Sequence, residues 1–217
     1  MLAQPSQSAD LVELFLNEGF KQTFKKGELI IRPGETPSGI FYIKTGLVKA
    51  YDITKYQEEN LLIIRKDQEI FPLIWALTGK ERKVIYEALV DTLTFRVSRQ
   101  RFLNFLNKNP EGLSLILDMT IEMYRLHSER ILNLEYRTVR ERLISFLLTM
   151  SQRFGTIQDN KIEIKVPLRH QDIASSINAS RETTSRELSS LEKRGLIKSK
   201  KSIIMIEDLA KIKKYIN

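Results

Sequence analysis

Three side chains near the end of the sequence have the types and spacing needed to read the edges of base pairs. Arg181, Glu182 and Arg186 lie close together in the chain. On an α-helix, where each residue turns about 100°, Glu182 and Arg186 lie on the same side. An arginine can donate two hydrogen bonds to guanine O6 and N7, and a glutamate can accept one from cytosine N4. These residues therefore predict recognition of bases in the major groove, provided that a helix presents them there.

A helix followed by a tight turn is predicted directly before these residues. Ile173, Ala174 and Ile177 give this first helix one buried face, and Ala174 is small where a second helix must cross closely. Asn178 then occupies a position where a tight turn favours a positive φ, which asparagine tolerates better than most residues. The pattern is typical of the first half of a helix-turn-helix.

The second helix is predicted over 181–194. Ser180 is a favourable N-cap residue, and Gly195 is a favourable residue just beyond the C-terminus of a helix. The helical period then separates two faces. The inward face consists of Thr184, Leu188 and Leu191, and the outward face consists of Glu182, Arg186, Ser189 and Lys193.

A basic hairpin is predicted to follow, with Leu196 and Ile197 leading into a turn over 198–201 and a strand over 203–206. Its lysines can contact phosphate, as can residues at the start of the first helix, where that helix would cross the DNA backbone. The whole predicted DNA-contacting set is Arg169, His170, Gln171, Ser180, Arg181, Glu182, Thr183, Ser185, Arg186, Lys200 and Lys201.

The alternative to DNA binding is a pair of helices that serves only as core, with Glu182 and Arg186 forming an ordinary ion pair four residues apart. The short turn, the N-cap, the small crossing residue and the basic hairpin together favour DNA binding over this alternative. The charge distribution along the chain also favours DNA binding. The 217-residue chain has a net charge of +8, and residues 161–217 have 13 Lys and Arg against 7 Asp and Glu. Such an excess suits a polyanion, although it also fits a solvated surface.

The elements before this region divide into a β-rich part and a helical part. Residues 24–98 contain short apolar runs separated by Lys-Gly, Pro-Gly and Thr-Gly pairs, which predicts an antiparallel barrel or roll. A short amphipathic helix is predicted before it, ending at Gly19. After the long helix described next, a helix over 139–153, ending at Gly155, and a strand over 162–166 are predicted to lead into the helix-turn-helix.

A long helix is predicted from Pro110. Seven residues follow a 3.5-residue repeat, which keeps one side of the helix facing a partner helix. The favoured interpretation is a dimer seam, because the middle of the stripe is semi-polar; the alternative is a helix that lies on its own barrel. The stripe consists of Leu113, Leu117, Thr120, Tyr124, His127, Ile131 and Leu134.

The composition excludes several chemistries. The chain has no cysteine and two histidines, His127 and His170, so disulfides, thiolate-bound zinc and iron–sulfur clusters are excluded and an all-protein metal site is not expected. Residues 1–110 contain no histidine, which argues against a metal-dependent enzyme built on the β-rich part. No phosphate-binding glycine loop or nucleophile elbow is present. We therefore expect a protein that is not an enzyme.

No spanning helix or leader is predicted, which favours the cytoplasm.

At this point the chain resembles the CRP/FNR family of bacterial transcription regulators over nearly its whole length. The resemblance implies an α+β fold with a cyclic-nucleotide-binding-type antiparallel β-roll over 1–109, a long dimerisation helix over 110–137 and a winged helix-turn-helix over 138–217. The matching segments are Ser180–Arg186, Leu191–Ile197, Lys26–Glu28, Pro33–Glu35 and Tyr42–Gly46.

The resemblance further implies a homodimer that binds a palindrome of TGTGA-like half-sites in double-stranded DNA, with RNA polymerase as a partner and a small-molecule effector possible. The alternative is a sensor module that acts through protein partners and binds DNA only nonspecifically. No membrane partner is expected.

The segment Phe71-Pro72-Leu73 departs from the family pattern. Members that bind cyclic AMP have Phe-Gly-Glu there; proline lacks the backbone N–H and leucine lacks the carboxylate, so cyclic-nucleotide binding is not expected. Haem is not expected either, because His127, the one candidate axial ligand outside the DNA-binding unit, is better explained as a polar seam residue bonded to its symmetry mate or to Tyr124. The predicted effector pocket consists of Phe71, Leu73, Trp75, Arg82, Tyr86, Tyr124, His127 and Ser128.

Overall fold

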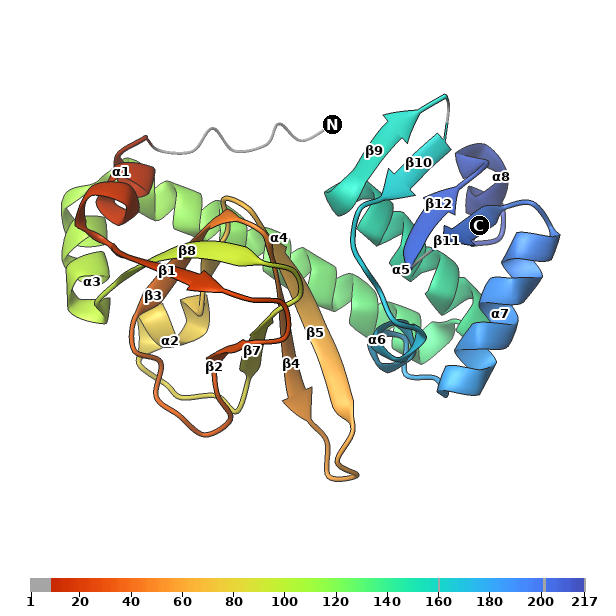
Figure 1. The fold of residues 1–217 in the computed structure, drawn as a ribbon, viewed down its shortest axis with the longest axis horizontal. Helices are drawn as coiled ribbons and strands as arrows, with labels where there is room; N and C mark the ends of the chain where they lie inside the picture. The colour runs from red at the N-terminus through yellow and green to blue at the C-terminus, as the bar shows by residue number, and fades with distance from the viewer. Residues whose placement is uncertain (1–8, 160, 201, 217) are drawn as a thin grey trace. The chain divides into compact units, whose positions relative to one another are not determined.

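The computed structural model describes residues 9–159, 161–200 and 202–216. The chain divides into two compact units (Figure 1). The first comprises residues as far as 53 together with 62–127, and the second comprises 54–61 together with 128–217. The division falls inside the long helix, after His127, whereas the sequence analysis placed its boundaries at the two ends of that helix.

The first unit is built on two four-stranded antiparallel sheets. Their strand orders are β1-β8-β3-β6 and β2-β7-β4-β5. The strands are β1 (Phe20–Phe24), β2 (Leu29–Ile31), β3 (Ile40–Thr45), β4 (Leu47–Ile53), β5 (Glu59–Lys66), β6 (Ile70–Phe71), β7 (Ile85–Ala88) and β8 (Thr92–Val97). The helices with residues in this unit are α1 (Ala9–Glu18), α2 (Leu73–Thr78), α3 (Arg99–Lys108) and α4 (Pro110–Tyr136).

The core of the first unit explains why α1 and α3 lie on the β-roll. Phe15 of α1 stacks on Tyr42 of β3 with ring centroids 5.6 Å apart, and it also meets Phe102 of α3. All three rings are buried. Because a buried Phe contributes about 1.5–3 kcal/mol relative to exposure, these contacts stabilise the packing of α1 and α3 on the β-roll.

The long helix α4 has one buried and one exposed side. Leu115 and Ile116 are buried in the core of the first unit, with Met119 and Met123 packed against it. The predicted stripe faces elsewhere: Leu117 is 57% and Tyr124 74% exposed in the described chain. A stripe covered by its own barrel does not fit these exposures.

In the described residues, the second unit combines a four-stranded antiparallel sheet with four helices, the end of α4 and the first residues of β5. The sheet has the order β11-β12-β10-β9, and β10 pairs with both β9 and β12. The elements are α5 (Val139–Phe154), β9 (Gly155–Gln158), β10 (Lys161–Ile164), α6 (His170–Ser176), α7 (Arg181–Lys193), β11 (Ile197–Lys200), β12 (Ile203–Ile206) and α8 (Leu209–Lys213).

The α+β fold class, with an N-terminal antiparallel β-roll, a long helix and a C-terminal winged helix-turn-helix, is confirmed. Local details of the second unit differ from the prediction. Gly155 does end α5, but the chain turns there into strand β9, because Gly155 to Gln158 pair with Ile164 to Lys161. The helix α8 was not predicted. In the described part of the chain, no helix has the length and apolar character needed to span a membrane.

Candidate nucleic-acid interface

The helix α6 and the turn after it place α7 as the sequence predicts. Ile173, Ala174 and Ile177 are buried, and Ala174 is fully covered where α6 and α7 cross. The N–H of Ala179 donates to the carbonyl of Ala174 at 3.0 Å. Asn178 has φ 50°, which confirms the left-handed turn residue.

Ser180 begins α7 as an N-cap. Its Oγ accepts a hydrogen bond from the Thr183 N–H at 3.1 Å, and such caps contribute about 1 kcal/mol. The inward face of α7 is buried as predicted. It consists of Thr184, Leu188 and Leu191.

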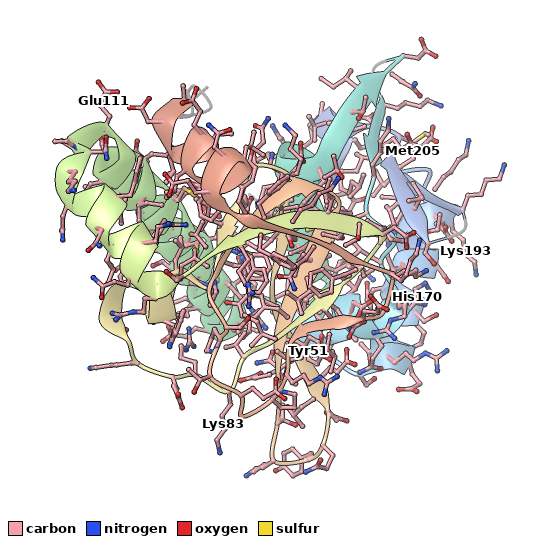
Figure 2. All side chains as sticks on the ribbon, turned by 60° about the vertical axis from the view of Figure 1, so that its left-hand side comes forward. Tyr51, Lys83, Glu111, His170, Lys193 and Met205 are labelled. Atoms are coloured by element: carbon pink, nitrogen blue, oxygen red, sulfur yellow. The ribbon has the colours of Figure 1, made fainter. Side chains whose placement is uncertain are left out.

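The outward face of α7 is polar and solvent-exposed. Arg181, Glu182 and Arg186 are all exposed, and Lys193 projects from the surface near the end of the helix (Figure 2). Arg186 is oriented by its neighbours: its Nη2 donates to Thr183 Oγ1 at 3.2 Å, and Ser180 Oγ lies 3.0 Å from the same oxygen. The first two turns of α7 thus present two guanidinium groups and a carboxylate toward solvent, the groups that hydrogen-bond base edges.

An ion pair joins α7 to α5. Arg140 Nε donates to Glu187 at 2.7 Å. The hydrogen bond and charge of Glu187 raise the pKa of Arg140 above its usual range, so this guanidinium stays charged. The ion pair holds one side of α7 against α5, while the other side of α7 faces solvent.

The basic hairpin of β11 and β12, called the wing below, differs in one detail from the prediction. Lys198, Ser199 and Lys200 belong to strand β11 rather than to a turn, because they pair with Met205, Ile204 and Ile203 of β12. Lys201 lies outside the described residues. Lys200 is exposed and can meet a phosphate.

Two carboxylates secure the wing to the rest of its unit. Glu192, near the end of α7, accepts a hydrogen bond from the Ser199 N–H at 2.8 Å. Glu207 pairs with Lys161 at 2.6 Å and with Lys198 at 3.5 Å. The hydrogen bond from Lys161 is the main reason that the pKa of Glu207 lies below its usual range. Lys198 is thereby partly neutralised, whereas Lys200 extends the positive charge of the wing.

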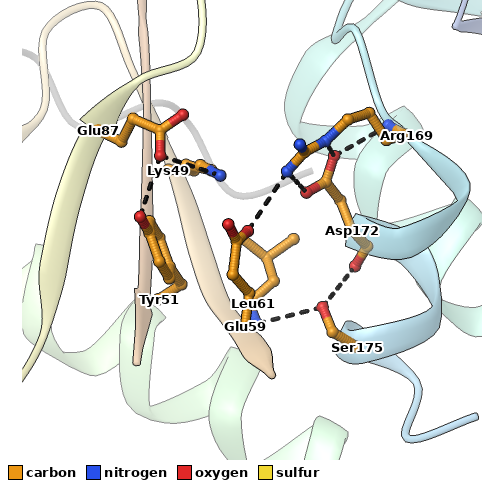
Figure 3. A network of polar contacts seen from close by, with 8 residues as sticks. All are labelled: Lys49, Tyr51, Glu59, Leu61, Glu87, Arg169, Asp172 and Ser175. Carbon is orange, nitrogen blue, oxygen red and sulfur yellow. Dashed lines mark hydrogen bonds and ion pairs between the residues drawn. The ribbon is translucent and has the colours of Figure 1, made fainter. Parts of the chain in front are cut away.

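The predicted phosphate contacts lie at the start of α6. His170 and Gln171 are exposed. Arg169 immediately precedes the helix, and its guanidinium already has two carboxylate partners: Nη2 lies 2.9 Å from Asp172 and 3.3 Å from Glu59, both within the second unit (Figure 3). A phosphate that bonds to Arg169 must therefore compete with these carboxylates.

The C-terminal stop of α7 gives the first testable prediction. Gly195 has φ 67°, and a Cβ built there meets nothing within 4 Å. We expect Gly195→Ala to lower the free energy of unfolding by about 1–2 kcal/mol, because only the left-handed backbone disfavours the methyl group. Urea unfolding followed by circular dichroism measures this. Ser189→Ala, at an exposed position of α7, is the matched control and is expected to change stability by less than about 0.5 kcal/mol. Equal stability of Gly195→Ala and the wild type would contradict a left-handed backbone at this position.

The predicted effector residues are spread over the first unit and its boundary. Phe71 is buried and stacks between Phe41, at 5.2 Å, and Tyr86, at 4.8 Å. Arg82 lies exposed in the segment between α2 and β7. The remaining members are placed as follows: Leu73 is buried, Trp75 and His127 are half-buried, Tyr124 is exposed, and Ser128 belongs to the second unit.

The structure also contains buried charges that the sequence analysis missed. Lys49 of β4 is 2% exposed and pairs with Glu87 of β7 at 3.1 Å, and Tyr51 donates to the same carboxylate (Figure 3). Arg65 of β5 is 4% exposed. The available signal was a charged residue within or at the end of an apolar strand, where a solvated charge is not expected.

Two family models match the chain. A cyclic nucleotide-binding domain model matches residues 21–109, and a Crp-like helix-turn-helix domain model matches residues 141–215. The first match covers most of the β-roll, and the second covers α6, α7 and the wing.

Curated relatives cover most of the chain. The Global nitrogen regulator of Nostoc sp. is 28% identical over 188 residues, which are 85% of this chain and 84% of that protein. The CRP-like cAMP-activated global transcriptional regulator of Mycobacterium tuberculosis is 24% identical over 185 residues, covering 85% and 83% of the two chains.

Solved structures share the fold. A mutant of CooA from Carboxydothermus hydrogenoformans superposes with a TM-score of 0.80 at 21% identity, covering 95% of each chain. FixK2 from Bradyrhizobium japonicum superposes with a TM-score of 0.79 at 22% identity, covering 90% of this chain and 96% of that one. The order of β-roll, long helix and winged helix-turn-helix is therefore a known arrangement.

Proposed function

Because the chain belongs to the CRP/FNR family of DNA-binding transcription regulators and is not an enzyme, we propose that it binds palindromic promoter DNA as a homodimer. The outward face of α7 is the observation on which this proposal rests. Arg181, Glu182 and Arg186 are exposed there, while the opposite face of the helix is buried. Each protomer inserts α7 into the major groove and reads a TGTGA-like half-site.

The homodimer is proposed from the exposed stripe of α4. Leu113, Leu117 and Tyr124 are each more than half exposed. Two such stripes packed against each other remove them from water, at about 25 cal/mol for each Å² of apolar surface. A two-fold dimer places the two α7 helices about 34 Å apart, which matches one turn of B-DNA.

The β-roll is proposed to be the sensor. Pro72 and Leu73 start α2 at the position where the cyclic-AMP-binding pattern has glycine and glutamate, and they supply neither the N–H nor the carboxylate. The effector is accordingly of another class, and the proposed pocket retains Phe71, Trp75 and Tyr86 among its members. No iron–sulfur cluster is involved, because the chain has no cysteine. The proposed site of action is the cytoplasm, with RNA polymerase as the partner at the promoter.

DNA binding tests the proposal directly. Fluorescence anisotropy at moderate salt compares a labelled palindrome, whose two TGTGA-like half-sites are centred one helical turn apart, with a scrambled duplex of the same composition. We expect the palindrome to bind about 10³-fold or more tightly. Equal affinity for both duplexes, with and without candidate effectors, would contradict sequence-specific binding and favour a module that acts through protein partners.

A further inference from the structure

Arg65 is a buried guanidinium at the end of an otherwise apolar strand segment. Its side chain is 5% exposed, and it follows Leu61 to Ile64 in β5. Removing an arginine from water is costly unless its N–H groups are paired, because the charge loses its hydration. The hydrogen-bond acceptors around Arg65 therefore show whether its charge is fully paired within the protein.

The donors of Arg65 are unequally satisfied. Nη1 donates to the carboxylate of Glu69 at 3.2 Å. Nη2 contacts the thioether sulfur of Met123, which is a weak acceptor. Nε, buried like the rest of the group, has no hydrogen-bond partner among the described residues.

Nε and Nη2, the two nitrogens of Arg65 without a strong acceptor, are the pair that can bind an anionic group. Nε and Nη2 project in parallel from one side of a guanidinium, and this pair donates two hydrogen bonds to one carboxylate or phosphate group. Among the described residues, the hydrogen-bond contact on this side of Arg65 is the sulfur of Met123. The Glu69 carboxylate uses the other end of the group.

The surroundings of Arg65 suit an anion. Burial raises the pKa of the Tyr86 hydroxyl, and the positive charges of Arg65 and Arg82 oppose this shift by a smaller amount. Arg65 and Arg82 are thus the two charged groups that favour an anionic form at the Tyr86 hydroxyl. The Tyr86 ring stacks on Phe71, so the hydroxyl is held beside an aromatic wall.

We propose that the first unit binds a small anion, through a carboxylate or phosphate group that accepts two hydrogen bonds from Nε and Nη2 of Arg65. The anion takes the place of the Met123 sulfur at Nη2, and Tyr86 and Arg82 complete the site. Met123 lies on α4 directly before Tyr124 of the exposed stripe. Displacing Met123 therefore acts on the helix that carries the proposed dimer seam.

The proposal deepens the proposed function, because it names the ligand class of the sensor, but its test needs no DNA. Isothermal titration calorimetry is run on the full-length protein, freed of anions other than chloride, with inorganic phosphate in one series and succinate in another at constant ionic strength. Saturable binding in one series but not the other identifies the anion class. Specific DNA binding can fail while anion binding succeeds, and the reverse also holds, so the two failures are distinguishable.

Arg65→Lys is the decisive variant. Lysine keeps the charge but cannot form the paired bonds, and a hydrogen bond to a charged group contributes about 1.5–3 kcal/mol, so the affinity is expected to fall about tenfold or more. Arg101→Lys is the matched control, because Arg101 is half-exposed and pairs with Glu18. Its anion affinity is expected to equal that of the wild type.

Glu69→Gln provides a second measurement if Arg65→Lys fails to fold. Removing this carboxylate lessens the negative charge near the guanidinium, so anion affinity is expected to rise. No saturable binding of either anion to the wild type would overturn the proposal. Unchanged affinity in Arg65→Lys would overturn it too, as would unchanged affinity in Glu69→Gln.

Discussion

Arg186→Ala is expected to weaken binding to the palindromic site by about 1–3 kcal/mol for each half-site and to relax selectivity at one base pair in each half. The reason lies in how the guanidinium is held. Thr183 accepts a hydrogen bond from Nη2 at 3.2 Å, while the rest of the exposed group faces solvent on the outward side of α7. A guanidinium oriented in this way loses little side-chain entropy when it meets guanine O6 and N7.

The measurement is a set of anisotropy titrations with duplexes that vary one base pair of the half-site at a time. In the wild type, one position should discriminate strongly among the four base pairs, and in Arg186→Ala that discrimination should disappear while the other positions keep theirs. Since Arg186 lies outside the buried face of α7, the stability of the variant should stay within about 0.5 kcal/mol of the wild type.

Lys200→Ala is the matched control. Lys200 is exposed on strand β11 and is expected to contact phosphate, which has no base identity. Its loss should weaken all duplexes alike and reduce the slope of log affinity against log salt by about one. If Arg186→Ala behaved in the same way as Lys200→Ala, Arg186 would be a phosphate contact and another residue would read the base.

The helix-turn-helix could be predicted in detail because its signals are local. The left-handed turn at Asn178, the N-cap at Ser180 and the stop at Gly195 each depend on a residue's own backbone preference. The buried and exposed faces of α7 follow from its helical period alone. Nothing remote in the chain is needed to place these features.

Other features depend on partners that are distant in the sequence. Arg65 meets Met123, 58 residues away, and Arg169 meets Glu59, 110 residues away. Periodicity indicates that Arg65 ends an apolar run, but only the three-dimensional structure shows that its Nε has no acceptor in the part of the chain that is described. The strand β9 was missed for a related reason, because Gly155 signals the end of a helix and does not reveal the pairing that follows.

The largest effect is expected from the exposed stripe of α4. Leu117→Glu combined with Tyr124→Glu should convert the protein from dimer to monomer, because four carboxylates would then face one another where two apolar stripes meet. Leu117 and Tyr124 are exposed in the single chain, so the substitutions remove no contact that the folded protomer needs. Sedimentation equilibrium measures the mass, and circular dichroism checks that the protomer is folded.

Loss of the dimer should also abolish tight DNA binding. Two linked α7 helices bind two half-sites together, and this linkage raises affinity by about 10²–10⁴-fold over one half-site alone. The double variant should therefore bind the palindrome about 10²-fold or more weakly, and no more tightly than a duplex with a single half-site. Asp118→Ala is the control, since Asp118 is exposed and lies about 100° around the helix from Leu117. A double variant that stayed dimeric would place the interface elsewhere, and a monomer with wild-type affinity for the palindrome would show that the two half-sites are read independently.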